Sequence, residues 1–180
     1  MSGARIPAWA VSARGLAVAA ALGAATGSRT FAAAAVISRH LAGHRIRHAR
    51  RIGREIVPRR EPDPIRRALG SATASRVLSA VSLGELIADK LPGIPARIEP
   101  GPLAARGLMG ALLGWSVGQG RIGRSVSAAI GAAAALAGGT AAYHARRHLT
   151  GRYAVPDPAI ALAEDAITLA VASAAVSRMR

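Results

Sequence analysis

Apolar residues in this chain form long blocks. They do not alternate with polar residues, as they would in a half-buried strand. Five apolar segments have roughly the length that a helix needs to cross a bilayer, and polar or proline-containing stretches separate them. They cover residues 16–41, 72–91, 103–118, 126–145 and 157–178. Small residues recur within them every four positions, as at Ser127, Gly131, Ala135 and Gly139. The pattern predicts an all-α membrane bundle of about five transmembrane helices with Gly/Ala packing seams, forming one domain over residues 1–180.

Two alternatives to this bundle are weighed. A water-soluble alanine-rich bundle would need a polar stripe along every helix, and the segments at 103–118 and 126–145 lack one. A secretory signal is suggested by Arg5 followed by the short apolar stretch 16–25. An equally apolar run, residues 31–37, follows Arg29 almost directly, which favours the longer first segment.

The net charge of +15 is concentrated between the first two segments, because nine arginines fall between Arg45 and Arg67. This clustering disfavours nucleic-acid binding and is typical of a loop kept in the cytoplasm. We therefore predict a multi-pass protein of the cell inner (plasma) membrane with an Arg-rich cytoplasmic loop at residues 43–69, which contacts anionic lipid headgroups. A short amphipathic helix at 44–57 and a solvated linker are both compatible with this stretch. In this topology Arg14 and Arg146 fall on the outer side.

Ionisable residues inside apolar segments are costly in lipid, so by default they indicate a functional site. The stretch at residues 83–92 (LGELIADKLP) contains three such residues, and Arg29 interrupts the first segment beside Gly27 and Ser28. Most of these charges gather toward one side of the predicted bundle. The candidate binding residues are Arg29, Glu85, Asp89, Lys90, Arg97, Arg106, Glu164 and Asp165.

Two interpretations of these charges stay open. In the first, Glu85 or Glu164 pairs with Arg29 or Arg106 in a latch that only fixes helix register. In the second, the carboxylates couple to a proton or ion, and an arginine at a broken helix meets an anionic ligand. Glu85 and Asp89 are four residues apart, so they share a helix face and could also hold a cation.

A weak internal echo relates residues 23–41 to residues 131–149. Both begin with Gly-Ala-Ala and end with Arg-His-Leu, and each precedes a segment that contains a glutamate, Glu85 or Glu164. With one segment between the two pairs, the halves would have opposite orientations, as in inverted-repeat transporters.

The sequence contains no catalytic motif, no cofactor fingerprint and no cysteine. Its five histidines form no clear metal site, and the metal content stays open. The leading hypothesis is a small transporter or channel-like protein that self-associates through its small-residue seams. One alternative is a membrane enzyme acting on a lipid headgroup, with Mg²⁺ at Glu85 and Asp89 and phosphate at Arg97 and Arg106. Another is a scaffold that binds anionic lipid or a partner through the Arg-rich loop.

Several stretches together resemble a known bacterial family. They are residues 23–31 (GAATGSRTF), 84–97 (GELIADKLPGIPAR), 103–107 (LAARG), 138–147 (GGTAAYHARR) and 162–166 (LAEDA). The chain from about Leu22 onward is similar to the membrane proteins grouped as "domain of unknown function 4126". The long Arg-rich stretch and the residues before Gly15 depart from that pattern. The resemblance implies an integral membrane protein and argues against a signal peptide, but it implies no reaction or substrate.

Overall fold

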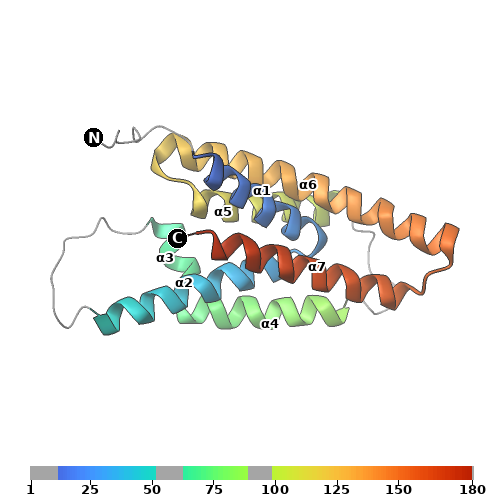
Figure 1. Cartoon of the computed structure of the whole chain (residues 1–180), viewed down its shortest axis with the longest axis horizontal. Helices are drawn as coiled ribbons and strands as arrows, with labels where there is room; N and C mark the ends of the chain where they lie inside the picture. Colours follow the sequence, from blue (N-terminus) through green and yellow to red (C-terminus); the bar gives the residue numbers. More distant parts are fainter. Residues whose placement is uncertain (1–11, 52–62, 89–98, 180) are drawn as a thin grey trace, which may run out of the picture.

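The computed structural model describes residues 12–51, 63–88 and 99–179, and these residues form seven helices and no strand (Figure 1). The all-α prediction is confirmed. The helices are α1 (Ala13–Ser28), α2 (Ala32–Arg51), α3 (Pro64–Leu69), α4 (Ala72–Ala88), α5 (Pro100–Val117), α6 (Gly120–Tyr153) and α7 (Asp157–Ser177).

The first apolar segment is two helices rather than one span, and the chain reverses direction between them (Figure 1). Arg29 has extended backbone angles, φ −138° and ψ 109°, and ends α1. Val18 near the start of α1 and Leu41 within α2 belong to the same core cluster as Val176 near the end of α7, as a hairpin requires. The reversal puts the start of α1, with Arg14, at the end of the bundle that holds α3 and the start of α6 (Figure 1). The predicted position of Arg14 opposite the Arg-rich stretch is therefore wrong.

Glycines let α6 approach two other helices at backbone contact. A Cβ atom added at Gly131 would collide with the carbonyl oxygen of Gly110 on α5, and one added at Gly23 on α1 would collide with that of Gly131. The four predicted small residues of α6 are all buried. Close backbone approach through small residues is how helices pack in lipid, where burying apolar surface gives no advantage. The predicted seam is confirmed between α6 and both α1 and α5.

Small and polar residues are buried while many large apolar side chains face outward. Arg29, with 1% of its surface exposed, heads the fully buried side chains by volume. Leu108 on α5 and Ile167 on α7 are 69% and 63% exposed. Two helices, α6 and α7, are long and apolar enough to cross a membrane, so the five-span count stays a prediction.

Two local boundaries differ from the sequence-based expectation. Helix α2 continues to Arg51, and α3 begins at Pro64 with Asp63 as its N-cap, so helix occupies parts of the predicted loop at 43–69. At α7 the N-cap is Pro156, one residue before the predicted segment, and Asp157 is the first helical residue. An acidic residue in the first turn is favoured by the helix dipole, and Asp157 also pairs with Arg146 of α6.

Candidate functional site at the break between α1 and α2

Arg29 lies at the end of α1 and points into α7. Its Nε donates to Oδ1 of Asp165 at 2.5 Å, and its Nη2 lies 3.5 Å from the carbonyl oxygen of Ala161. The same Nη2 is 3.9 Å from Oε2 of Glu164. A buried guanidinium is tolerated because two carboxylates and a carbonyl replace its water, and removing its partners would leave an uncompensated charge. Arg29 therefore holds the α1–α2 break against α7.

Glu85 lies at the same break but makes a different kind of contact. Its two carboxylate oxygens accept from the backbone N–H groups of Thr30 at 2.7 Å and of Phe31 at 2.9 Å. These N–H groups come directly before the first residue of α2, where a helix has free donors and a partial positive charge. Glu85 thus acts as a cap supplied by α4, an interaction that is usually made by a neighbouring residue in the sequence.

Glu164 links the buried break to the end of α6. Its Oε2 lies 3.8 Å from Nη1 of Arg146, besides its contact with Arg29. Arg146 also binds Asp157 through two parallel hydrogen bonds, of which Nε to Oδ1 is 2.6 Å. One α7 carboxylate therefore lies between two arginines from different helices. We refer to Arg29, Glu85, Glu164 and Asp165 as the break cluster.

A hydroxyl pair extends the polar contact between α1 and α7. Ser28 Oγ and Thr168 Oγ1 are 2.5 Å apart, and Ser28 Oγ also lies 3.1 Å from the carbonyl oxygen of Ala25. Thr168 is one turn beyond Glu164 on α7, so hydroxyl and carboxylate groups follow one another along the face that meets α1.

Arg106 is buried on α5, at the interface with α6. The aliphatic part of its side chain packs near Gly139 of α6, since a Cβ atom added at Gly139 would lie 3.6 Å from Cδ of Arg106. Gly139 in turn lies against Gly27 of α1, two residues before Arg29. The structure thus brings Arg29, Glu85, Glu164 and Asp165 together and places Arg106 on the neighbouring helix interface.

Three of the predicted site residues, Asp89, Lys90 and Arg97, lie outside the described residues. The structure therefore leaves the pairing of Glu85 with Asp89 as a prediction. In the part of the chain that is described, no group of three or more His, Asp or Glu residues could hold a metal ion. Glu85 directs both oxygens to backbone amides, which is the arrangement of a cap.

Sequence reasoning missed the parts that Arg146 and Asp157 play. Arg146 enters the sequence-based prediction only through the topology, and Asp157 only as the first residue of the last apolar segment. A signal was present, because the two residues flank the short connection between consecutive apolar segments. A helical hairpin brings such positions together. Ser28 and Thr168 carried no comparable signal, since they are 140 residues apart.

Comparison with known proteins identifies no relative. No family model matches the chain, and neither a curated protein nor a solved structure does so. The resemblance to the "domain of unknown function 4126" proteins therefore stays a prediction.

Proposed function

We propose that this chain is an integral, multi-pass protein of the cell inner membrane, working as a small transporter or channel-like protein. Its distribution of side chains supports the membrane part of the proposal. Many large apolar residues on α4, α5, α6 and α7 face outward, while two arginines and several hydroxyl groups are buried beside small residues and apolar ones such as Leu22 and Leu113. Exposed apolar faces of this extent are unfavourable in water and favourable in lipid.

The distribution of charge supports an orientation. The end of the bundle with the start of α1, α3 and the start of α6 is rich in arginine (Figure 1). Its arginines include Arg14, Arg66, Arg67, Arg121, Arg124 and Arg178, together with Arg45, Arg47, Arg50 and Arg51 in the last turns of α2, whereas Arg146, Arg147 and Arg152 lie at the other end. Five of the six described acidic residues lie toward the opposite end, namely Glu85, Glu99, Asp157, Glu164 and Asp165. The positive-inside rule assigns the arginine-rich end to the cytoplasm.

The single observation that carries the transport proposal is the break cluster itself. A helix that breaks inside an apolar bundle, with an arginine and carboxylates from two other helices at the break, is typical of substrate and ion pathways in membranes. A latch that only fixes helix register would need a single pair of one arginine and one carboxylate. Here Glu85 covers backbone amides that could bind an anion, while Asp165 and Glu164 hold the adjacent Arg29.

The proposed roles follow from these contacts. Glu85 acts as a tethered anion on the amides of Thr30 and Phe31, and it must leave before another anion can bind there. Glu164 and Asp165 compete with that anion for Arg29. Because each must give up its present contact before the anion can bind, Glu85 and Glu164 serve as the coupling carboxylates. Arg29 then provides the contact to the transported anion.

Flux through reconstituted vesicles tests the proposal. Purified protein in liposomes would be assayed for chloride, phosphate and proton movement over a range of pH. We expect flux above protein-free vesicles, altered in rate or pH dependence by Glu85→Gln and unchanged by Glu99→Gln. Glu99 is a matched control because it is an exposed glutamate at the start of α5. The absence of flux with every ion and pH would overturn the transport proposal.

A structural role is the second candidate, because every residue of the break cluster already has a partner within the fold. In this case the cluster fixes the α1–α2 hairpin, and the chain serves as a scaffold that binds anionic lipid or a partner through its Arg-rich stretch. The structural role predicts that the wild-type protein shows no flux. It also predicts that Glu85→Gln lowers the stability of the fold. Neutralising Arg50, Arg51 and Arg54 should abolish partner binding, and intact binding would contradict the scaffold.

A further inference from the structure

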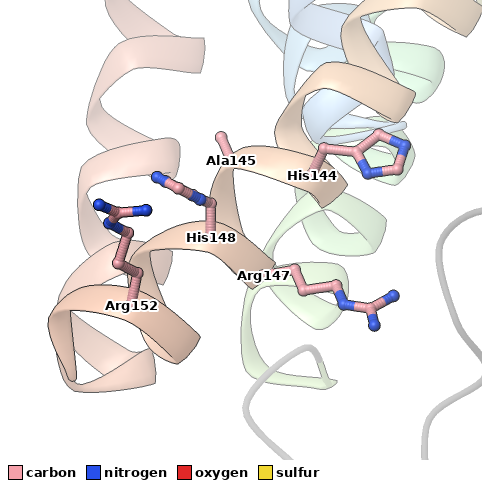
Figure 2. A pocket seen from close by; sticks show the side chains of 5 residues that line it. All are labelled: His144, Ala145, Arg147, His148 and Arg152. Atoms are coloured by element: carbon pink, nitrogen blue, oxygen red, sulfur yellow. The ribbon is translucent and has the colours of Figure 1, made fainter.

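The last turns of α6 form a cationic surface that the break cluster does not use. An open hollow there is lined by His144, Ala145, Arg147, His148 and Arg152 (Figure 2). All five residues are exposed. In Figure 2, His144 and Arg147 point to one side of the helix while His148 and Arg152 point to the other. The four cationic or imidazole side chains therefore surround the helix end as a collar rather than closing a pocket. We call His144, Arg147, His148 and Arg152 the α6 collar.

The arginines of the collar differ from their neighbour Arg146. Arg146 turns toward α7 and binds Asp157 and Glu164. Within the described residues, neither Arg147 nor Arg152 is in an ion pair. An arginine that folding requires is normally paired in this way, whereas an outward-facing arginine without an acid retains its fork of N–H donors for a ligand. The collar is therefore suited to an anion outside the protein.

The length of α6 places the collar relative to a bilayer. Its 34 residues span about 51 Å at 1.5 Å per residue. This exceeds a hydrocarbon core of about 30 Å, or about 45 Å with headgroups. The end of α6 also projects beyond α1 and α5 in Figure 1. An α6 that crosses the membrane must therefore place its last turns among headgroups.

Aromatic residues flank the collar in the way that an interface favours. Tyr153 is exposed, and its ring centroid lies 5.7 Å from that of His148. Tyr143 makes a similar edge contact with His144, with centroids 5.3 Å apart. Tyrosines next to arginines are typical of the boundary between lipid tails and water. This arrangement favours a lipid headgroup over a free phosphate ion as the source of the anion.

We propose that the α6 collar binds the phosphate groups of anionic phospholipids, with Arg147 and Arg152 as the principal contacts and the imidazoles as additional donors. The site lies at the end of the bundle opposite α3. It rests on the proposed membrane location but not on transport. Its effect is to fix how far the α6–α7 hairpin, and with it Glu164, enters the bilayer.

Photo-crosslinking of the full-length protein in vesicles tests this site. The probes are phosphatidylglycerol and phosphatidylcholine with a photoreactive group near the headgroup, and labelled peptides are mapped by mass spectrometry. We expect phosphatidylglycerol to label residues 143–153 several-fold more than phosphatidylcholine. Each arginine near an anionic surface contributes about fivefold in affinity, so Arg147→Gln with Arg152→Gln should reduce binding about thirtyfold. The matched control is Arg121→Gln with Arg178→Gln at the other end, which should leave this labelling unchanged.

Other arms separate the possible failures. Equal labelling by both lipids, or no loss in the double variant, would overturn the collar. Displacement of the lipid by millimolar inorganic phosphate would assign the site to free phosphate and contradict the headgroup. A photoreactive group on the lipid tail should label the exposed Leu108 and Ile167 faces. If it does not, the membrane location fails. Flux without selective labelling refutes the collar alone, and labelling without flux refutes only transport.

Discussion

Two segments with the same small-residue pattern take different shapes in this protein. Residues 23–41 break at Arg29 into α1 and α2, whereas residues 131–149 continue as one helix within α6. The α1 part of the first segment lies against the second, and Gly23 and Gly27 meet Gly131 and Ala135. The glycine spacing that the segments share therefore builds one interface between them. The residues that follow these glycines decide whether the segment breaks or continues as one helix.

The difference lies in which residues follow the shared glycine face. The first segment has Ser28, Arg29 and Thr30 where the second has Leu136, Ala137 and Gly138. These polar groups find partners on other helices, Asp165 on α7 and Glu85 on α4, so the broken backbone is satisfied. The comparison teaches that helix propensity alone does not make the break. Polar contacts from distant parts of the chain stabilise it.

The comparison also corrects the predicted inverted repeat. Gly23 meets Gly131, and Gly27, further along α1, meets Ala135 and Gly139, so α1 and the middle of α6 run in the same direction. The expected opposite orientation therefore fails for α1, whereas α2, after the chain turns back at the break, runs opposite to α6 (Figure 1).

The largest expected effect comes from removing the charge that holds the break. Arg29→Met should lower the free energy of unfolding by about 3–5 kcal/mol, because Asp165 and Glu164 would remain without their buried partner. Thermal unfolding in lipid nanodiscs measures this loss. Adding Asp165→Asn should recover part of the stability. The matched control Arg39→Met removes an exposed contact with Ser79 and should cost little. Equal losses in both arginine variants would contradict the assignment.

The interface that both segments share should be the next most sensitive position. Gly131→Ala places a Cβ against the Gly110 carbonyl oxygen and should cost about 1–3 kcal/mol through overpacking. Gly123 on the same helix is the control, since a Cβ there meets nothing within 4 Å. Gly123→Ala should stabilise the helix by about 0.5–1 kcal/mol. Opposite signs for the two alanine variants would confirm the seam, and a tolerated Gly131→Ala would refute it.

Weakening the cap should affect the broken segment and leave α6 unchanged. Glu85→Gln retains one acceptor oxygen but loses the charge at the start of α2, with an expected cost of about 0.5–2 kcal/mol. Hydrogen exchange at the amides of Thr30 and Phe31 should become faster, while exchange in the middle of α6 stays constant. Unchanged protection at both amides would show that Glu85 does not hold the break.

The smallest effect is expected at the end of α6. Arg146 contacts the same Glu164 oxygen as Arg29, but its partner Asp157 is 56% exposed. Solvent screening should therefore limit the cost of Arg146→Met to about 1 kcal/mol or less. The melting temperatures of Arg146→Met and Arg29→Met would be compared. Their difference measures how much burial increases the stability that an arginine contributes through its contact with Glu164. A larger loss at Arg146 would reverse the proposed ranking.

The all-α class and the seam could be predicted because both depend on local spacing. A glycine every four residues marks one helix face whatever surrounds it. The hairpin could not be predicted in the same way. Its reversal depends on Glu85 and Asp165, which are 55 and 136 residues from the groups that they contact. The sequence suggested that Arg29 pairs with Glu85 or Glu164, and the structure supports Glu164. Glu85 instead accepts hydrogen bonds from the backbone N–H groups of Thr30 and Phe31.

The distance in sequence between Arg29 and its partners has a consequence for how the protein is made. At about 5–20 residues per second, the ribosome completes Asp165 about 7–27 s after Arg29, given their separation of 136 residues. During that interval the arginine has none of its α7 carboxylates, so a nascent α1–α2 hairpin cannot settle in lipid at low cost. In the proposed membrane location, the hairpin would therefore wait at the membrane surface or within the insertion machinery until α7 emerges. Assembly of the bundle is thus timed by its last helix.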